Sequence, residues 1–242
     1  MTTFPIAIEQ PYGPRRRDGQ RTMAVTTVAV LRRALNIAIA LTALILLLPL
    51  VLLVALAVKL SSRGPIFYTQ TRVGLNRRRL LPPGSRYREA DCGGQPFTIF
   101  KFRTMRVDGG HQGAARPKQV WATPDDPRVT RVGRILRLYR LDELPQLLNV
   151  LLGDMDIVGP RPEQPAIFAR LRDQIPRYQE RQRVRPGITG WAQINLHYDS
   201  TIEDVRKKLA LDLEYISRRS LTEDLRIMLR TLPVVAGGFG GW

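Results

Sequence analysis

The sequence predicts a mostly α-helical protein with a small β-hairpin, attached to one side of a membrane by a re-entrant helix broken at Pro49, and therefore monotopic. Three observations support this fold class: a long uncharged apolar run, basic residues on both sides of it, and apolar stripes at helical spacing in the C-terminal half. The chain has 242 residues, which suffices for a membrane segment and one compact domain.

The apolar run extends from Ile37 to Val58 without a charged residue. At about 1.5 Å per residue it forms roughly 33 Å of helix, enough to cross a bilayer core of about 30 Å. A cleaved signal peptide is the alternative, because Ala55-Leu56-Ala57 has the small residues of a cleavage site. Its apolar region would, however, exceed the usual ~7–15 residues. We therefore interpret the run as a membrane segment.

Pro49 lies near the middle of this run, where the missing backbone N–H favours a kink or a break. A kinked spanning helix is one interpretation, since proline is tolerated in such helices. The basic flanks favour another, because Lys and Arg mark the cytoplasmic side of a membrane segment. These flanking residues are Arg32, Arg33, Lys59 and Arg63. A re-entrant helix over residues 31–60, with both ends on the cytoplasmic side, satisfies both flanks.

The formal net charge of +17 is concentrated around the membrane segment, because no Asp or Glu occurs between Asp18 and Glu89. Cations at this place suit anionic lipid headgroups, at about 1 kcal/mol each. Nucleic-acid binding is the usual alternative for so basic a chain, but Arg77-Arg78-Arg79 has no interleaved aromatic residues. The expected partner is membrane lipid, and no nucleic acid is expected.

The rest of the chain divides by composition. We expect a flexible basic arm over residues 1–30, a cytoplasm-facing domain over 61–233 and a tail over 234–242. Within the domain, residues 65–73 and 97–105 are rich in aromatic and β-branched residues and predict two strands that form a hairpin. Residues 74–95 between them predict a basic excursion rich in Gly and Pro.

A helix is predicted to begin at Asp142, because leucines recur at helical spacing after it. The stripe consists of Leu144, Leu147, Leu148 and Leu151. Pro145 is tolerated only in the first turn, and Gly153 suits the position just past the end. Asp142 and Glu143 are therefore expected at the N-terminus of this helix.

Two further helices are predicted near the C-terminus from capping-box patterns at Ser200 to Glu203 and Ser220 to Glu223. The second carries an apolar stripe of Leu221, Leu225, Met228, Leu229 and Leu232. This stripe either packs on the core or lies on the membrane surface, and core packing is favoured.

A carboxylate pair at a helix start has a structural explanation, since Asp and Glu there complement the helix dipole. A functional role is indicated by three cations elsewhere in the sequence. They are Lys101 and Arg103 on a predicted strand, and Arg161 in Gly159-Pro160-Arg161-Pro162-Glu163. A helix N-terminus with such cations can hold phosphate. Carboxylates beside a phosphate repel it unless a cation intervenes, which implies Mg²⁺ held by one or two carboxylates of the Asp142 and Glu143 pair together with phosphate oxygens.

Several segments carry a resemblance to a known family. They are Lys101 to Met105, Asp126 to Arg134, Leu141 to Leu147, Asn149 to Leu151, Gly153 to Met155, Val158 to Glu163 and Arg185 to Gln193. In this order and spacing they resemble the bacterial sugar transferase family, the polyprenyl-phosphate glycosyl-1-phosphate transferases, in its compact monotopic form. The resemblance covers roughly residues 30–233.

The resemblance implies an enzyme of the bacterial inner membrane whose catalytic domain faces the cytoplasm. It would transfer sugar-1-phosphate from a UDP-sugar to polyprenyl (undecaprenyl) phosphate and release UMP, which initiates cell-surface polysaccharide or glycan synthesis. Asp142 corresponds to the nucleophile that forms a phosphosugar-aspartyl intermediate, Glu143 to the Mg²⁺-binding acid and Arg161 to a phosphate-binding arginine. Lys101, Arg103 and Arg185 either contact substrate phosphate or pair with structural carboxylates.

The sequence departs from the family pattern in the long basic excursion at 74–95, and it lacks the extra spanning helices of larger relatives. Two other functions stay open at this point. One is a membrane-bound scaffold without chemistry, in which the motif residues determine the fold. The other is a glycosyl transferase that moves sugar without phosphate, for which UDP rather than UMP is the leaving product.

Overall fold

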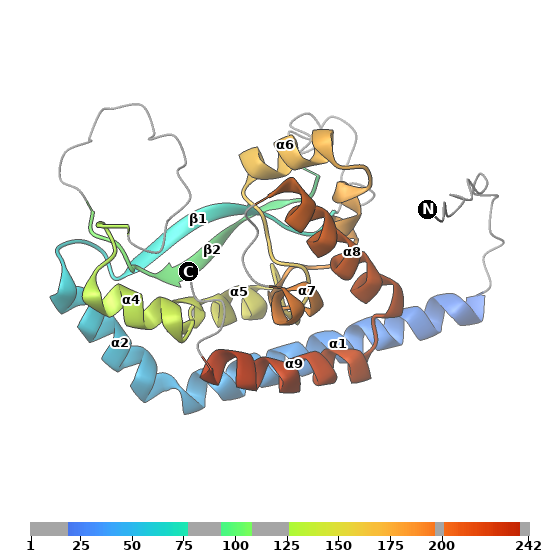
Figure 1. Cartoon of the computed structure of the whole chain (residues 1–242). Coiled ribbons are helices and arrows are strands. Elements are labelled where there is room, and N and C mark those ends of the chain that lie inside the picture. Colours follow the sequence, from blue (N-terminus) through green and yellow to red (C-terminus); the bar gives the residue numbers. More distant parts are fainter. Residues whose placement is uncertain (1–18, 77–92, 108–125, 197–200, 238–242) are drawn as a thin grey trace.

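The computed structural model describes residues 19–76, 93–107, 126–196 and 201–237 (Figure 1). Its elements are α1 (Gly19–Leu46), α2 (Leu48–Ser61), β1 (Phe67–Val73), β2 (Pro96–Phe102), α4 (Arg131–Leu138), the 3-10 turn η2 (Leu141–Glu143), α5 (Gln146–Leu152), β3 (Asp156–Val158), α6 (Pro165–Gln174), the 3-10 helix η3 (Tyr178–Arg183), β4 (Gly187–Thr189), α7 (Trp191–Asn195), α8 (Ile202–Arg218) and α9 (Leu221–Ala236). The predicted mostly helical fold with a small antiparallel sheet is confirmed.

The apolar run is divided between α1 and α2, which point in different directions from their junction (Figure 1). The interruption expected at Pro49 falls at Leu47, whose φ and ψ are −91° and 3°. A proline ring collides with the carbonyl of the residue four positions earlier, so the helix is interrupted just before Pro49. Within the described residues, one stretch, Thr27–Leu46, is long and apolar enough to cross a membrane by length and composition.

Parts of the expected flexible arm and tail are helical. Helix α1 begins at Gly19, so residues 19–30 are helical, while 1–18 lie outside the described residues. The helical part contains no proline and several good helix formers. At the other end, α9 continues past Pro233 to Ala236, beyond the predicted tail boundary at 234.

The middle of α1 packs into the domain through polar contacts. Arg33 donates from Nη1 to the Val150 carbonyl (2.6 Å) and from Nη2 to the Leu151 carbonyl (2.9 Å), which caps the end of α5. The buried Asn36 accepts a hydrogen bond from the Ile157 amide (2.6 Å). The apolar helix is therefore part of the domain core.

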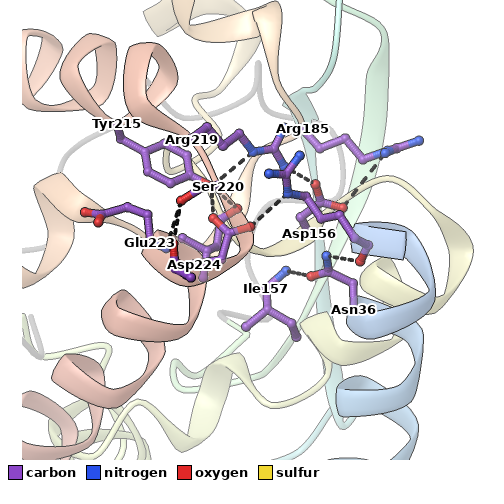
Figure 2. Close-up of polar contacts among 12 residues, drawn as sticks. Asn36, Asp156, Ile157, Arg185, Tyr215, Arg219, Ser220, Glu223 and Asp224 are labelled. Carbon is purple, nitrogen blue, oxygen red and sulfur yellow. Dashed lines mark hydrogen bonds and ion pairs between the residues drawn. The ribbon is translucent and has the colours of Figure 1, made fainter. Parts of the chain in front are cut away.

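A second set of contacts joins α1 to α8 and α9. Asp224 accepts from the Tyr215 hydroxyl (2.6 Å) in Figure 2 and from Arg32 Nε (2.9 Å). In the same region Asp156 on β3 pairs with Arg219 at 2.6 Å (Figure 2). Buried carboxylates need such partners, because an unpaired charge inside a protein is costly.

Strands β1 and β2 are antiparallel, with Phe67 opposite Phe102 and Val73 opposite Pro96, as predicted for 65–73 and 97–105. Most of the basic excursion, residues 77–92, lies outside the described residues. Asn149, fully buried on α5, donates to the Thr98 carbonyl (2.7 Å) and accepts from the Phe100 amide (3.1 Å) of β2. Helix α5 is thus attached to this sheet.

A second sheet, the parallel pair β3 and β4, was not predicted.

The N-terminal caps of the two C-terminal helices, α8 and α9, were predicted in part. Ser220 accepts from the Glu223 amide at the start of α9, as expected. Helix α8, however, is capped one residue later than expected, by Thr201 in a reciprocal pair with Asp204.

The prediction that the apolar stripe of α9 packs on the core is wrong for three of its leucines. Leu225, Leu229 and Leu232 are 54%, 60% and 66% exposed. The buried face of α9 instead holds Ile227 and Asp224. Because Asp224 pairs with Arg32 on α1, the face that carries Asp224 and Ile227 turns inward and these leucines turn outward.

We predict that Asn149→Ala lowers the free energy of unfolding by about 2 kcal/mol, because it leaves a strand amide and a strand carbonyl without partners. Urea unfolding of the protein in detergent micelles measures this. The control is Asn195→Ala, an exposed asparagine that donates to the Trp191 carbonyl (2.7 Å). Its expected change is within about 0.5 kcal/mol. Equal effects of the two changes would contradict the role given to Asn149.

Candidate active site

The carboxylate pair lies on η2, between α4 and α5 and against β2. The α-helix predicted to start at Asp142 starts instead at Gln146, with Pro145 in the capping position. Because Pro145 has no N–H, the chain before it closes a 3-10 turn, in which the Glu143 amide donates to the Arg140 carbonyl (3.1 Å). The end of α5 at Gly153, in the left-handed region with φ of +91°, is as predicted.

Arg140 directly precedes this turn and has a φ of 53°, in the left-handed region. A non-glycine residue there costs about 1 kcal/mol. The chain reverses sharply at Arg140, between the end of α4 and η2. This reversal places both carboxylates inside the domain, with Asp142 8% and Glu143 6% exposed.

Glu143 is bound by two cations. Arg161 donates to it bidentately, with Nη2 2.6 Å from Oε1 and Nη1 3.2 Å from Oε2. Lys101 Nζ lies 2.8 Å from the same Oε1. Burial alone would raise the pKa of Glu143, but Arg161 and Lys101 outweigh burial and hold it well below its usual range. Glu143 is therefore ionised.

Asp142 has a different environment. Its nearest cation is Lys101, with Nζ 3.8 Å from Oδ2, and no hydrogen bond reaches its carboxylate from the residues that the structure describes. Burial raises the pKa of Asp142, and Lys101 only partly opposes this. Adjacent carboxylates in such unlike surroundings are suited to different roles. Glu143 is held in place by Arg161 and Lys101, whereas the contact of Asp142 with Lys101 is longer.

The profile of the bacterial sugar transferase family matches residues 27–238, which include all of these side chains. The chain belongs to this family.

Three relatives illustrate the family. A UDP-glucose:undecaprenyl-phosphate glucose-1-phosphate transferase of Caulobacter vibrioides is 47% identical over 76% of this chain and 62% of its own length. A UDP-N-acetylgalactosamine-undecaprenyl-phosphate N-acetylgalactosaminephosphotransferase of Aeromonas hydrophila is 39% identical over 88% of this chain and 45% of its own length. The exopolysaccharide production protein PSS of Rhizobium leguminosarum is 38% identical over 84% of this chain and 94% of its own length. The chain thus spans less than two thirds of the first two relatives and nearly all of the third.

The donor atoms of this bacterial sugar transferase fit Mg²⁺ that is shared with a substrate. Among the described residues, no group of three or more His, Cys, Asp or Glu side chains could hold a metal by itself. Mg²⁺ commonly takes one or two carboxylates and completes its shell with phosphate oxygens and water. Asp142 and Glu143 are an adjacent pair of carboxylates of this kind, and their binding of Mg²⁺ stays a prediction.

Two arginines near the pair were missed by sequence reasoning. Arg72 on β1 donates from Nη1 to the Pro162 carbonyl (3.1 Å), and Arg140 precedes η2. Burial lowers the pKa of both, and nearby Arg161 lowers it further. With Lys101 they give the site more positive than negative charge, which suits an anionic substrate. The position of Arg140 beside the Asp-Glu pair was the available signal.

The structure brings Lys101, Asp142, Glu143 and Arg161 together but places two other predicted phosphate ligands elsewhere. Arg103 caps the end of α2, because Nη1 donates to the Arg63 carbonyl (2.8 Å) and Nη2 to the Ser62 carbonyl (2.7 Å). Arg185 donates from Nε to the Gly153 carbonyl (3.0 Å), at the end of α5. Phosphate binding by either residue stays a prediction.

We predict that Arg103→Met lowers the free energy of unfolding by about 2–3 kcal/mol, because the carbonyls at the end of α2 lose charged donors. Urea unfolding in detergent micelles checks this, with exposed Arg106→Met as the control. Unchanged stability together with a large rise in the KM for a UDP-sugar would instead favour phosphate binding by Arg103.

Proposed function

We propose that this chain transfers sugar-1-phosphate from a UDP-sugar to polyprenyl (undecaprenyl) phosphate, releases UMP, and so initiates cell-surface polysaccharide or glycan synthesis. The observation that carries the proposal is the buried pair in which Glu143 binds two cations while neighbouring Asp142 accepts no hydrogen bond from the described residues. The names of the relatives from Caulobacter and Aeromonas support this reaction class.

Asp142 is the proposed nucleophile. Its carboxylate oxygen forms a bond to the β-phosphorus of the UDP-sugar, the bond from that phosphorus to the bridging oxygen breaks, and UMP leaves with the electron pair. An oxygen of the lipid phosphate then attacks the same phosphorus and displaces the Asp142 carboxylate. Because a covalent intermediate separates the two steps, the soluble donor and the lipid acceptor need not be bound together.

The cations around Asp142 prepare the site for the donor. Phosphoryl transfer depends mainly on positioning and charge neutralisation. Arg161 and Lys101, which neutralise Glu143 in the structure, are placed to share their donors with diphosphate oxygens. Mg²⁺, held by Asp142 and Glu143 when bound, would neutralise further charge on those oxygens.

For the reaction, we predict that Asp142→Asn lowers UMP release by at least about 10³-fold, because the amide is a poor nucleophile. Membranes containing the protein are incubated with radiolabelled UDP-sugars and polyprenyl phosphate, and the released nucleotide is identified. The control is Asp173→Asn, whose carboxylate is 68% exposed. Undiminished release by Asp142→Asn would overturn the nucleophile assignment, and release of UDP would favour the glycosyl transferase alternative.

We further propose that α1 and α2 form a re-entrant helix pair in the bacterial inner membrane, with the catalytic domain on the cytoplasmic side. Exposed apolar side chains on both helices support this placement. They include Leu41, Ile45, Leu46, Leu48, Leu52, Leu53 and Leu56. Helix α9, with its exposed leucines, lies along the same side of the molecule as α1 and α2 (Figure 1). That side is the proposed lipid-facing surface.

For the topology, we predict that cysteines introduced at Val28 and Arg63, both exposed, react from the same side in a Cys92→Ser background. A membrane-impermeant maleimide should label both in inverted membrane vesicles and neither in intact spheroplasts. Labelling from opposite sides would refute the re-entrant arrangement and favour a kinked spanning helix.

A further inference from the structure

The segment that carries Arg161 is held by its backbone carbonyls. The Pro160 carbonyl accepts from the Gly187 amide (3.0 Å), that of Arg161 from Arg181 Nη2 (2.9 Å), that of Pro162 from Arg72 Nη1 (3.1 Å) and that of Glu163 from the Val73 amide (2.8 Å). The prolines on either side of Arg161 have fixed φ angles and no N–H. Their carbonyls are therefore the groups through which hydrogen bonds can hold this segment.

Arg181 on η3, the donor to the Arg161 carbonyl, is itself 2% exposed. Its Nε donates to Asp212 Oδ2 (2.7 Å) and its Nη1 to the Tyr178 hydroxyl (2.8 Å). Nη1 also lies 3.4 Å from Glu163 Oε1. The planar guanidinium thus bridges α8, η3 and the Arg161 segment in one fixed geometry.

The carboxylates of this network are anchored from α8. Lys208 Nζ lies 3.1 Å from Glu163 Oε1, beside the contact with Arg181. Burial would raise the pKa of Glu163, but Lys208 and Arg181 lower it to about 2. Asp212 is 2% exposed and pairs with Arg181. Buried ion pairs stabilise a fold little compared with apolar side chains of the same size, so a geometric role explains the network better than a stabilising one.

We infer that Arg181 is a positioning residue for Arg161: it fixes the Arg161 carbonyl and thereby directs the Arg161 guanidinium toward Glu143 and the donor diphosphate. The inference rests on the proposed function, in which Arg161 binds that diphosphate. A lysine in place of Arg181 keeps the charge beside Asp212 but cannot donate in three directions within one plane. Arg161 would then keep its charge and lose its fixed position.

The test compares Arg181→Lys with Arg32→Lys in the full-length protein in detergent micelles. Arg32→Lys is a suitable control because Arg32 also donates through Nε to a buried aspartate, Asp224 (2.9 Å), without contacting Arg161. We expect Arg181→Lys to lower the kcat/KM for UDP-glucose roughly 10- to 100-fold, since small misplacement of a positioning group has effects of this size. Arg32→Lys should retain the wild-type value at a similar loss of stability in urea.

A double-mutant cycle with Arg161→Lys separates positioning from general destabilisation. If Arg181 acts through Arg161, adding Arg181→Lys to Arg161→Lys causes little further loss. If the losses of kcat/KM in the two single variants multiply in the double variant, the inference is overturned. An Arg181→Lys enzyme as active as the Arg32→Lys control would overturn it too.

If Arg181→Lys does not fold, Tyr178→Phe, which removes one acceptor from Arg181, replaces it. We then expect Tyr178→Phe to lower the kcat/KM a few fold in the wild-type background and to cause no further loss in the Arg161→Lys background. No loss in the wild-type background would overturn the inference.

Calorimetric titration with magnesium pyrophosphate provides a readout that needs no turnover. We expect the Kd to rise in Arg181→Lys and not in Arg32→Lys, and an unchanged Kd in both would count against the positioning role. If the wild-type protein binds pyrophosphate but releases no UMP from any UDP-sugar, the proposed function is contradicted. A rise in the Kd for pyrophosphate in Arg181→Lys would still support the positioning role of Arg181.

Discussion

Two adjacent buried carboxylates repel each other, and Asp142 and Glu143 stay inside this domain because Arg161 and Lys101 offset their charge. The bidentate contact of Arg161 with Glu143 joins the segment after β3 to η2, and Lys101 joins β2 to the same point. These contacts also make the two carboxylates unlike, because the pKa of Glu143 is held low while burial raises that of Asp142. The proposed division between a reacting and a charge-balancing carboxylate follows from this asymmetry.

The position of this site relative to the apolar helices depends on a separate set of polar contacts. Arg33 caps α5, the helix that follows the carboxylates, and Arg103 caps the end of α2. Asn36 accepts from the Ile157 amide of β3, and Arg32 pairs with Asp224 of α9. Apolar packing alone would allow α1 to slide or rotate, whereas directional hydrogen bonds fix its register. In the proposed reaction, these contacts would hold the carboxylates at a fixed position relative to the apolar helices.

Features set by neighbouring residues were predictable from the sequence, and those set by distant residues were not. The interruption near Pro49, the end of α5 at Gly153 and the cap at Ser220 follow from local chemistry. The outward leucines of α9 depend on Asp224 meeting Arg32, far away in the chain. The strands β3 and β4 are too short for a visible alternating pattern. For the candidate site, motifs predicted Asp142, Glu143, Arg161 and Lys101, which the structure brings together, but the capping role of Arg103 needed the fold.

The proposed role of Asp142 is to carry the sugar phosphate between donor and acceptor. Its most direct test is to incubate the full-length protein with UDP-sugar in the absence of polyprenyl phosphate, quench the reaction in acid and measure the protein mass. We expect a gain of one phosphosugar, located on Asp142 by peptide fragmentation and removed when polyprenyl phosphate is added. Release of UMP without an adduct, or an adduct on another residue, would contradict it.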